Sequence, residues 1–220
     1  MIIESGAGNH IVKNIAKNPS LSGICIKLIG NILAGESEDC DEMIGYGVFD
    51  IFINLINISN TLESQKEILW AISNITAGTR TNIKLFIQSN LIKVLLTKAN
   101  QINSVEVMTE FIWIFSNAIM GAEIEDIFNL LKLGVMDVYI NNLNNFNNPK
   151  VLLVTLEGLK FLFRFGDMSN LNMKKNEIVD AFCNLGGHLG LERISNHENI
   201  EVYETTELLI KEFFKYDQVN

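Results

Sequence analysis

The sequence predicts an all-α protein built from tandem repeats. Residues that close apolar helical patterns recur at separations of 43, 43 and 45, and a second series falls between them at separations of 41, 43, 44 and 53. The first series is Gly35, Gly78, Gly121 and Gly166, and the second is Gly6, Gly47, Asn90, Gly134 and Gly187. Gly and Asn tolerate the left-handed conformation that ends helices, so two helix ends are expected in each repeat. Strand patterns are nearly absent.

Apolar residues between these stops follow helical spacing. In VFDIFINLI, Val48, Phe52 and Ile56 recur at intervals of four, and LIKVLLTKA behaves in the same way. The two prolines, Pro19 and Pro149, both follow Asn. Because Asn is a good N-cap and proline suits the first helical position, each Asn-Pro pair predicts the start of the long last helix of a repeat.

A period of about 42 residues with two or three helices is in the range of armadillo and HEAT repeats. One repeat cannot bury its apolar face, so repeats are expected to stack into a right-handed armadillo superhelix, an α-solenoid, whose concave side is lined by the last helix of each repeat. We therefore predict a single solenoid. Its five expected repeats are 1–35, 36–78, 79–121, 122–166 and 167–220.

The two end repeats depart from this pattern. The first lacks most of its opening helix, so an uncovered edge is expected to expose Ile11, Ile15 and Ile24. Such an edge predicts either self-association or a place within a longer adaptor. The last repeat carries an insertion, DMSNLNMKKNE, which is expected to be a loop over residues 167–177.

Composition and charge favour basic partners. The net charge is −9 and the pI is about 4.9, which makes nucleic acid and anionic membrane poor partners. Cys25, Cys40 and Cys183 form no CxxC pair, so neither a disulfide framework nor a zinc site is predicted and the thiols are expected to be reduced. No secretory leader and no stretch of about eighteen apolar residues is present, so a soluble, intracellular protein is expected.

Other candidate motifs carry little chemistry. The acidic run ESEDCDE, residues 36–42, fits no calcium-loop spacing and is expected to be a solvated loop. The three histidines lack metal-ligand spacing, and His197 is expected to cap the last helices. The stretch GAGNHI fails the dinucleotide fingerprint, and no serine lies in a nucleophile elbow. An enzyme, a metal site and a cofactor are therefore not expected.

Two stretches share one skeleton: EILWAISNITAG and EFIWIFSNAIMG have Glu, Trp, Asn and Gly at the same offsets. Residues three and seven apart lie on one face of a helix, so each set forms a column. The columns are Glu67, Trp70 and Asn74, then Glu110, Trp113 and Asn117, with a weaker third made of Lys27 and Asn31. A lone Trp would be a core residue, but Glu and Asn on the same stripe would be costly to bury unpaired. The stripe is expected to face a groove that holds a positively charged ligand.

An extended basic peptide satisfies all three residue types. It presents side chains to one face at every second residue. Lys or Arg stems could lie between the indoles, with a cation–π contribution of about 0.5–2 kcal/mol each. The glutamates would receive the cationic heads, and Asn31, Asn74 and Asn117 would bind the peptide backbone.

The same motifs resemble those of importin-α, the armadillo adaptor that carries nuclear localisation signals. WAISNITAG is similar to the seventh repeat of that family and WIFSNAIMG to the eighth. NPKVLLVTLEGLKFLFRFG resembles the ninth repeat, and LERISNHENIEVYETTELLIKEFF the tenth. The similarity extends from Met1 to Phe214 and implies the C-terminal part of such an adaptor.

The resemblance implies specific roles. The columns with Ser73 match the minor signal-binding site of the family, and Asn31 with Gly35 match the edge of its sixth repeat. Lys27 stands where the family usually has Arg, which keeps the charge but loses the planar fork. Gly158 and Leu162 occupy the Trp and Asn positions of the fourth repeat, so the columns end there.

Partners and location also follow from the resemblance. Basic nuclear localisation signals of cargo proteins are expected in the groove, and an export receptor and a nucleoporin at the C-terminal repeats around NHENIEVYE. Importin-β would bind only through a segment that has no counterpart here. The protein would shuttle between cytoplasm and nucleus.

Two other classes stay open. A β-catenin-like scaffold would use the same solenoid for adhesion or signalling, but such grooves are typically basic and take acidic partners. The sign of the groove charge separates that class from the first. An enzyme would need a concave pocket of perturbed titratable groups rather than an open stripe.

Overall fold

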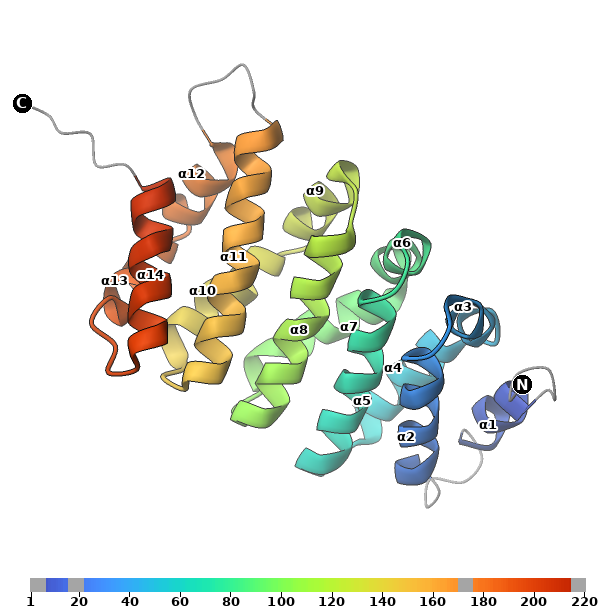
Figure 1. Ribbon diagram of the computed structural model, residues 1–220. Coiled ribbons are helices and arrows are strands. Elements are labelled where there is room, and N and C mark those ends of the chain that lie inside the picture. Colours follow the sequence, from blue (N-terminus) through green and yellow to red (C-terminus); the bar gives the residue numbers. More distant parts are fainter. Residues whose placement is uncertain (1–6, 16–21, 170–175, 215–220) are drawn as a thin grey trace, which may run out of the picture. The chain divides into compact units, whose positions relative to one another are not determined.

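The computed structural model describes residues 7–15, 22–169 and 176–214. Every regular element in these ranges is a helix, so the all-α prediction is confirmed (Figure 1). None of these helices has the length and apolar character needed to span a bilayer. The predicted helix stop Gly6 and the predicted helix start at Pro19 lie outside the described residues.

The chain divides into two compact units, an N-terminal unit (1–133) and a C-terminal unit (134–220). The N-terminal unit contains α1 (Ala7–Ile15), α2 (Ser22–Leu33), α3 (Ser37–Gly45), α4 (Val48–Ile58), α5 (Leu62–Thr76), α6 (Arg80–Gln88), α7 (Asn90–Lys98), the short 3-10 helix η2 (Ala99–Gln101), α8 (Val105–Gly121) and α9 (Ile124–Lys132). The C-terminal unit contains α10 (Val135–Asn145), α11 (Pro149–Ser169), α12 (Glu177–Asn184), α13 (Gly187–Ile194) and α14 (Ile200–Phe213).

Equivalent helices of successive repeats pack against each other in the N-terminal unit. The long helices α2, α5 and α8 stand side by side, with α5 contacting both neighbours (Figure 1). Behind them α4 packs against α7, while α3, α6 and α9 pack in sequence. Large side chains that are fully buried fill the space between these layers, among them Phe52, Phe86 and Phe111. The three long helices therefore share one continuous core and present one common outer stripe.

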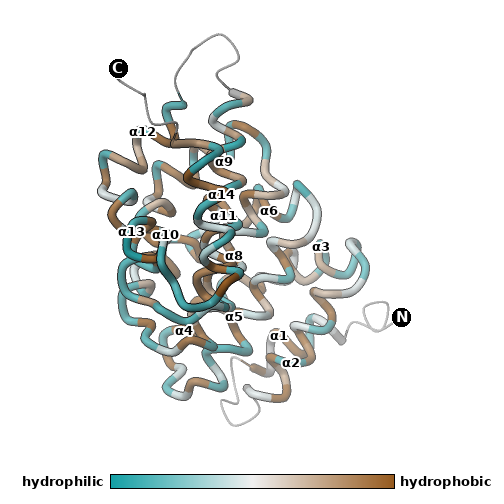
Figure 2. The backbone as a smooth tube through the Cα atoms, turned by 60° about the vertical axis from the view of Figure 1, so that its left-hand side comes forward, coloured by the Kyte–Doolittle hydropathy of each residue, from teal (hydrophilic) through white to brown (hydrophobic). Residues whose placement is uncertain are grey.

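Each helix keeps one apolar and one polar side. Figure 2 shows hydrophobic and hydrophilic residues alternating along the same helices, as expected for elements with one buried face. In the C-terminal unit the packing follows the same plan, with α10 against α13 and α11 against α14. Phe163 and Phe182 meet edge to face there, with ring centroids 5.1 Å apart.

Glycines with positive φ separate the first two helices of successive repeats. Gly47 and Gly134 have φ of 85° and 95°, as the spacing predicted, and each directly precedes a helix. In the last repeat the prediction was one residue too far, because the left-handed residue is Gly186, with φ of 81°. Gly187 is instead helical and buried, and a Cβ there would lie 2.3 Å from the ring of Phe182.

Two other predicted stops are wrong for physical reasons. Asn90 is the first residue of α7 rather than a left-handed stop, because Ser89 is extended and its hydroxyl caps the helix by accepting from the Leu91 N–H. Gly166 lies inside α11, where a Cβ would fall 2.1 Å from Oδ1 of Asn176. Close approach, not chain reversal, requires glycine at that position.

At both ends of the predicted loop of the last repeat, residues 167–177, the structure has helix or helix cap instead. Helix α11 continues to Ser169, and Asn176 already caps α12 by accepting from the N–H groups of Ile178 and Val179. Residues 170–175 lie outside the described ranges. The Asn-Pro signal at α11 is confirmed, because Asn148 Oδ1 accepts from the Lys150 N–H and Pro149 is the first helical residue.

Two predictions about the first repeats are wrong. The acidic run is helical rather than a loop, since α3 begins at Ser37, where acidic residues suit the first turn. Asp41 in this run accepts a 2.6 Å hydrogen bond from Asn82 on α6. Ile15 is buried, because α1 packs on α2, α3 and α4, whereas Ile24 is exposed as predicted.

The SNHEN motif joins two loops of the C-terminal unit. His197 Nε2 lies 2.9 Å from the carbonyl oxygen of Asn147, and its Nδ1 accepts from the Asn199 N–H at the start of α14. Arg193 adds a 2.7 Å bond from Nε to the carbonyl oxygen of Leu143. The N-cap of α14 is therefore Asn199, whose Oδ1 accepts from the Val202 N–H, while the His197 ring supports this cap residue and also holds the α10–α11 loop.

Candidate functional site

The predicted columns lie on the three long helices of the N-terminal unit. Lys27 and Asn31 are on α2, the first full column is on α5, and the second is on α8. Because α5 packs against both neighbours, the three columns lie side by side on one surface. We call this surface, made of the three columns with Glu63 and Lys66, the groove.

The Trp70 indole is seated on the neighbouring helix. A Cβ at Gly30 would lie 2.2 Å from Cζ3 of Trp70, so the ring rests directly on the α2 backbone. Both Trp70 and Trp113 are half-buried rather than fully buried. A tryptophan that is anchored on one side and accessible on the other offers a fixed wall for a ligand side chain.

The two column asparagines bind the backbone of the preceding repeat. Asn74 Nδ2 donates to the carbonyl oxygen of Gly30 at 3.0 Å, and Asn117 Nδ2 donates to that of Ser73 at 3.2 Å. Each amide keeps a second N–H and its Oδ1, for which the described residues supply no partner. These bonds fix the amide orientation and leave one donor and one acceptor for an extended chain.

Glu67 and Lys27 form an ion pair across α2 and α5. The Lys27 ammonium lies 3.6 Å from carboxylate oxygens of both Glu63 and Glu67. The Glu63 side chain is 81% exposed and that of Glu67 is 24% exposed, so Glu67 is the less hydrated acid. A cationic ligand that reaches Glu67 would compete with Lys27.

A hollow of about 380 Å³ opens between α5 and α8, lined by Lys66, Glu67, Trp70 and Glu110. Burial raises the pKa of Glu110, the Lys66 ammonium opposes the rise, and the Glu67 carboxylate adds to it. The net rise in pKa means that the Lys66 ammonium does not fully offset the cost of burying the charged carboxylate. The hollow thus offers two acids beside one half-exposed indole.

The raised pKa of Glu110 predicts a pH dependence of opposite sign for stability and for binding. The folded protein holds this proton more tightly than the unfolded chain does. The free energy of unfolding is therefore expected to increase as pH falls through the folded pKa of Glu110. A cationic peptide requires the ionised form, so its binding is expected to weaken as pH falls through the folded pKa of Glu110. Binding in that pH range should release a proton, which calorimetry in two buffers of different ionisation enthalpy would measure.

Glu110→Gln provides the control for this titration. The variant should bind a basic peptide more weakly at neutral pH and should show a flatter pH profile. An unchanged profile would assign the titration to another group.

Other predicted site residues lie at the edges or in the interior. Asn31 and Gly35 are exposed at the α2 edge. Ser73 is buried, and its hydroxyl donates to the carbonyl oxygen of Trp70 within α5. In the C-terminal unit Leu162 is fully buried, and a Cβ at Gly158 would lie 2.4 Å from the Tyr139 ring, so α11 presents neither a Trp nor an Asn equivalent.

Glu63 and Lys66 were missed in the sequence. Glu63 lies four residues before Glu67 and Lys66 lies one residue before it, so helical spacing alone would have placed Glu63 on the column. Lys66 gains its role only from the nearness of Glu110 on the next helix.

The part of the chain that the structure describes contains no group of three His, Cys, Asp or Glu side chains placed to hold a metal ion. Burial raises the pKa of the Cys40 thiol to about 11, with Asp41 adding to the rise, so this thiol is un-ionised at neutral pH.

Comparisons with known proteins identify the fold. The armadillo/β-catenin-like repeat family matches residues 37–77. A designed armadillo repeat protein in complex with the peptide (KR)4 superposes with a TM-score of 0.79 at 23% identity, over 96% of this chain and 84% of that one. No curated protein sequence matches the chain.

Two further solved structures agree. Another designed armadillo repeat protein gives a TM-score of 0.75 at 22% identity, over 96% of this chain and 83% of that one. Computationally designed armadillo repeat proteins for modular peptide recognition give 0.62 at 16% identity, over 93% and 99%. The chain therefore folds as an armadillo-repeat protein, which confirms the predicted solenoid class.

Proposed function

We propose that the groove binds extended basic peptides and that the chain thereby serves as a nuclear import adaptor of the importin-α kind. The observation that carries this proposal is the hollow between α5 and α8, where the Trp70 indole stands beside Glu67 and Glu110. Ligand ammonium or guanidinium groups would gain both a π face and a carboxylate there. The amides of Asn74 and Asn117 would hold the peptide backbone extended.

Two further points support a basic ligand. The designed relative with the same fold was solved with a peptide of alternating Lys and Arg. The groove carries the acids Glu63, Glu67 and Glu110 against two lysines, within a chain of net charge −9. In this proposal the chain is a binding scaffold rather than an enzyme, and it moves between cytoplasm and nucleus with cargo.

Titration calorimetry with a (Lys-Arg)4 peptide tests the proposal directly. We expect binding that weakens as salt rises, because part of the attraction is between exposed charges, and no binding of a (Glu-Asp)4 peptide. Trp70→Ala and Asn117→Ala should each lower the affinity without loss of helicity by circular dichroism. Binding that does not depend on salt, or equal binding of the acidic peptide, would overturn it.

Lys27 is expected to act as an internal competitor of the peptide. Removing its charge in Lys27→Met should raise the affinity for (Lys-Arg)4 by about two- to fivefold, because exposed ion pairs are weak. Lys84→Met, an exposed change of the same charge on α6, should leave the affinity unaltered apart from a small long-range effect. Weaker binding by Lys27→Met would instead make Lys27 part of the peptide site.

A scaffold for acidic signalling partners is the second candidate. Lys27 and Lys66 in the groove are the observation that favours it. The same calorimetry decides between the two, since the acidic peptide would then bind and the basic one would not.

We also propose a second partner surface on α14, where Ile200, Tyr203 and Leu208 are exposed. By resemblance to importin-α, an export receptor or a nucleoporin would dock there. Pull-down from nuclear extract with the full chain and with Leu208→Glu should show loss of either partner class in the variant. If the full chain recovers neither an export receptor nor a nucleoporin, the proposed partner surface on α14 would be contradicted.

A further inference from the structure

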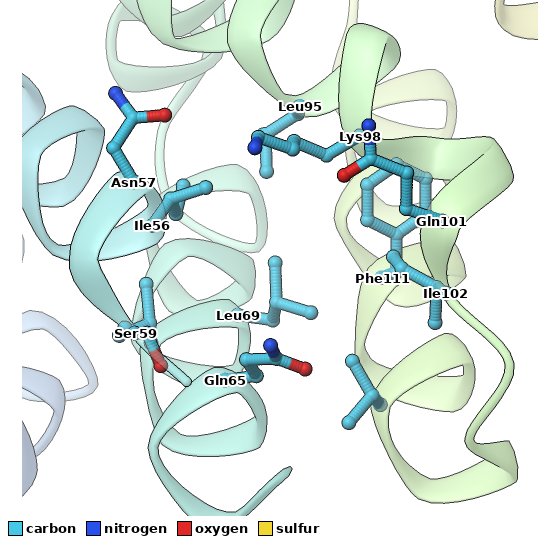
Figure 3. Close-up of a pocket in the computed structure, with 12 residues that line it drawn as sticks. Ile56, Asn57, Ser59, Gln65, Leu69, Leu95, Lys98, Gln101, Ile102 and Phe111 are labelled. Atoms are coloured by element: carbon cyan, nitrogen blue, oxygen red, sulfur yellow. The ribbon is translucent and has the colours of Figure 1, made fainter. Parts of the chain in front are cut away.

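A separate pocket lies in the N-terminal unit among α4, α5, α7, η2 and α8 (Figure 3). Its volume is about 180 Å³. Leu69, Leu95 and Phe111 form part of its apolar wall, and Gln65, Lys98 and Gln101 add polar groups. It uses a different side of α5 from the groove and shares no residue with it.

Lys98 is the single charged residue that lines this pocket. Its side chain is half-buried and forms no salt bridge with any residue in the described ranges. Figure 3 shows it extending across the upper part of the pocket from the α7 side toward Asn57 and Ile56. An ammonium held over an apolar cavity without a counter-charge is suited to a carboxylate ligand.

The repeat itself does not require a cation at this position. The equivalent residue one repeat earlier, 43 positions before Lys98, is Leu55, which is buried. Gln101 likewise corresponds to Ile58. A cation in the last turn also favours the helix dipole of α7, but that effect would be served equally by a lysine pointing into solvent. The polar groups are therefore specific to this pocket.

We propose that this pocket binds the free C-terminus of a partner chain that ends in an aliphatic residue. Neighbouring side chains of an extended segment point in opposite directions, so an internal Leu-Glu pair could not place both groups here. A terminal leucine carries its carboxylate and its side chain on one Cα. The side chain enters between Leu69 and Leu95, while the carboxylate accepts hydrogen bonds from Lys98 and from the amides of Gln65 and Gln101.

The probe is the peptide acetyl-Gly-Ser-Leu with a free carboxyl group, compared with the same peptide as its C-terminal amide. Methyl resonances of Leu69, Leu95 and Ile102 report binding in an NMR titration of the full chain. We expect the free acid to bind at least about tenfold more tightly than the amide, as a charged hydrogen bond implies. Acetyl-Gly-Ser-Ala should bind more weakly than the leucine peptide, because it leaves the apolar wall uncovered.

Variants on α7 assign the effect to Lys98. Lys98→Met should abolish the preference for acid over amide, and Lys98→Arg should retain it. Lys93→Met, an exposed change on the same helix, is the charge-matched control and should behave as the parent. The acid-to-amide ratio of the unmodified protein is decisive by itself if Lys98→Met loses its helical circular dichroism.

Equal binding of acid and amide by the parent would overturn the proposal. So would shifts confined to the Trp70 side of α5, which would place the peptide in the groove. A lack of basic-peptide binding leaves this inference untouched, since the two sites share no residue.

Discussion

Replacing both Glu67 and Glu110 by lysine is expected to reduce binding of (Lys-Arg)4 by at least about a hundredfold. Each acid lies in the hollow beside Trp70, and a hydrogen bond from a cation to a partly buried carboxylate contributes about 1.5–3 kcal/mol. Losing two such bonds gives a factor of about a hundred or more, before repulsion by the new cations is added. Fluorescence anisotropy with a labelled peptide measures the loss.

A control variant must separate the effect of the changed net charge from the effect of removing the two acids in the hollow. Glu36→Lys with Glu125→Lys makes the same change of net charge at two exposed acids, one at the N-cap of α3 and one on α9, and it should weaken binding only slightly at physiological salt. The isosteric pair Glu67→Gln and Glu110→Gln should fall between this control and the lysine variant. A double lysine variant that still binds within about threefold of the parent would show that the hollow is not the peptide site.

Acidic peptides provide the converse test. With Lys27 and Lys66 already present, the double lysine variant should acquire affinity for (Glu-Asp)4, which the parent should lack. Such an inversion would show that the sign of the groove charge, rather than the solenoid itself, selects the ligand.

Local sequence patterns predicted the helices because their causes are local. Apolar spacing of three and four, the Asn-Pro start of α11 and the φ requirement at Gly47 and Gly134 all act within a few residues. Two of the failures occurred where a glycine or a burial depended on a distant segment. Gly166 is glycine because Asn176 approaches it, and Ile15 is buried on α1, which packs against α2, α3 and α4.

The site shows the same division. Helical spacing placed Glu67, Trp70 and Asn74 in one column without any knowledge of the neighbours. The hydrogen-bond and ion-pair partners of these side chains could not be predicted from the sequence, because the register in which α2, α5 and α8 stack determines them. Asn74 donates its amide N–H to the carbonyl oxygen of Gly30, 44 residues away, and Lys27 forms an ion pair with Glu67, the acid that a cationic ligand would need.

Gly30 and Gly23 on α2 offer a matched pair of substitutions with opposite expected effects. Gly23 is exposed and a Cβ there meets nothing within 4 Å, so Gly23→Ala should stabilise the protein by up to about 1 kcal/mol through helix propensity. Gly30 is buried under Trp70, where a Cβ would lie 2.2 Å from Cζ3. Gly30→Ala is therefore expected to destabilise the protein by about 1–3 kcal/mol, as overpacking does.

Gly30→Ala should also impair the groove, although its side chain would touch no ligand. The added methyl must displace the Trp70 indole, and Asn74, whose amide is held by the Gly30 carbonyl oxygen, lies one helical turn away on the same face. We expect at least about a tenfold loss of (Lys-Arg)4 affinity, comparable to that of Trp70→Ala. In the double variant Gly30→Ala/Trp70→Ala, the second substitution should cost little further affinity, because both substitutions act through one indole. Removing the indole should also restore part of the stability that Gly30→Ala alone loses. Urea unfolding measures the coupling in stability, and fluorescence anisotropy measures the coupling in peptide affinity, for the parent, the two single variants and the double variant. Strictly additive losses of affinity would mean that the position of Trp70 does not depend on its contact with Gly30.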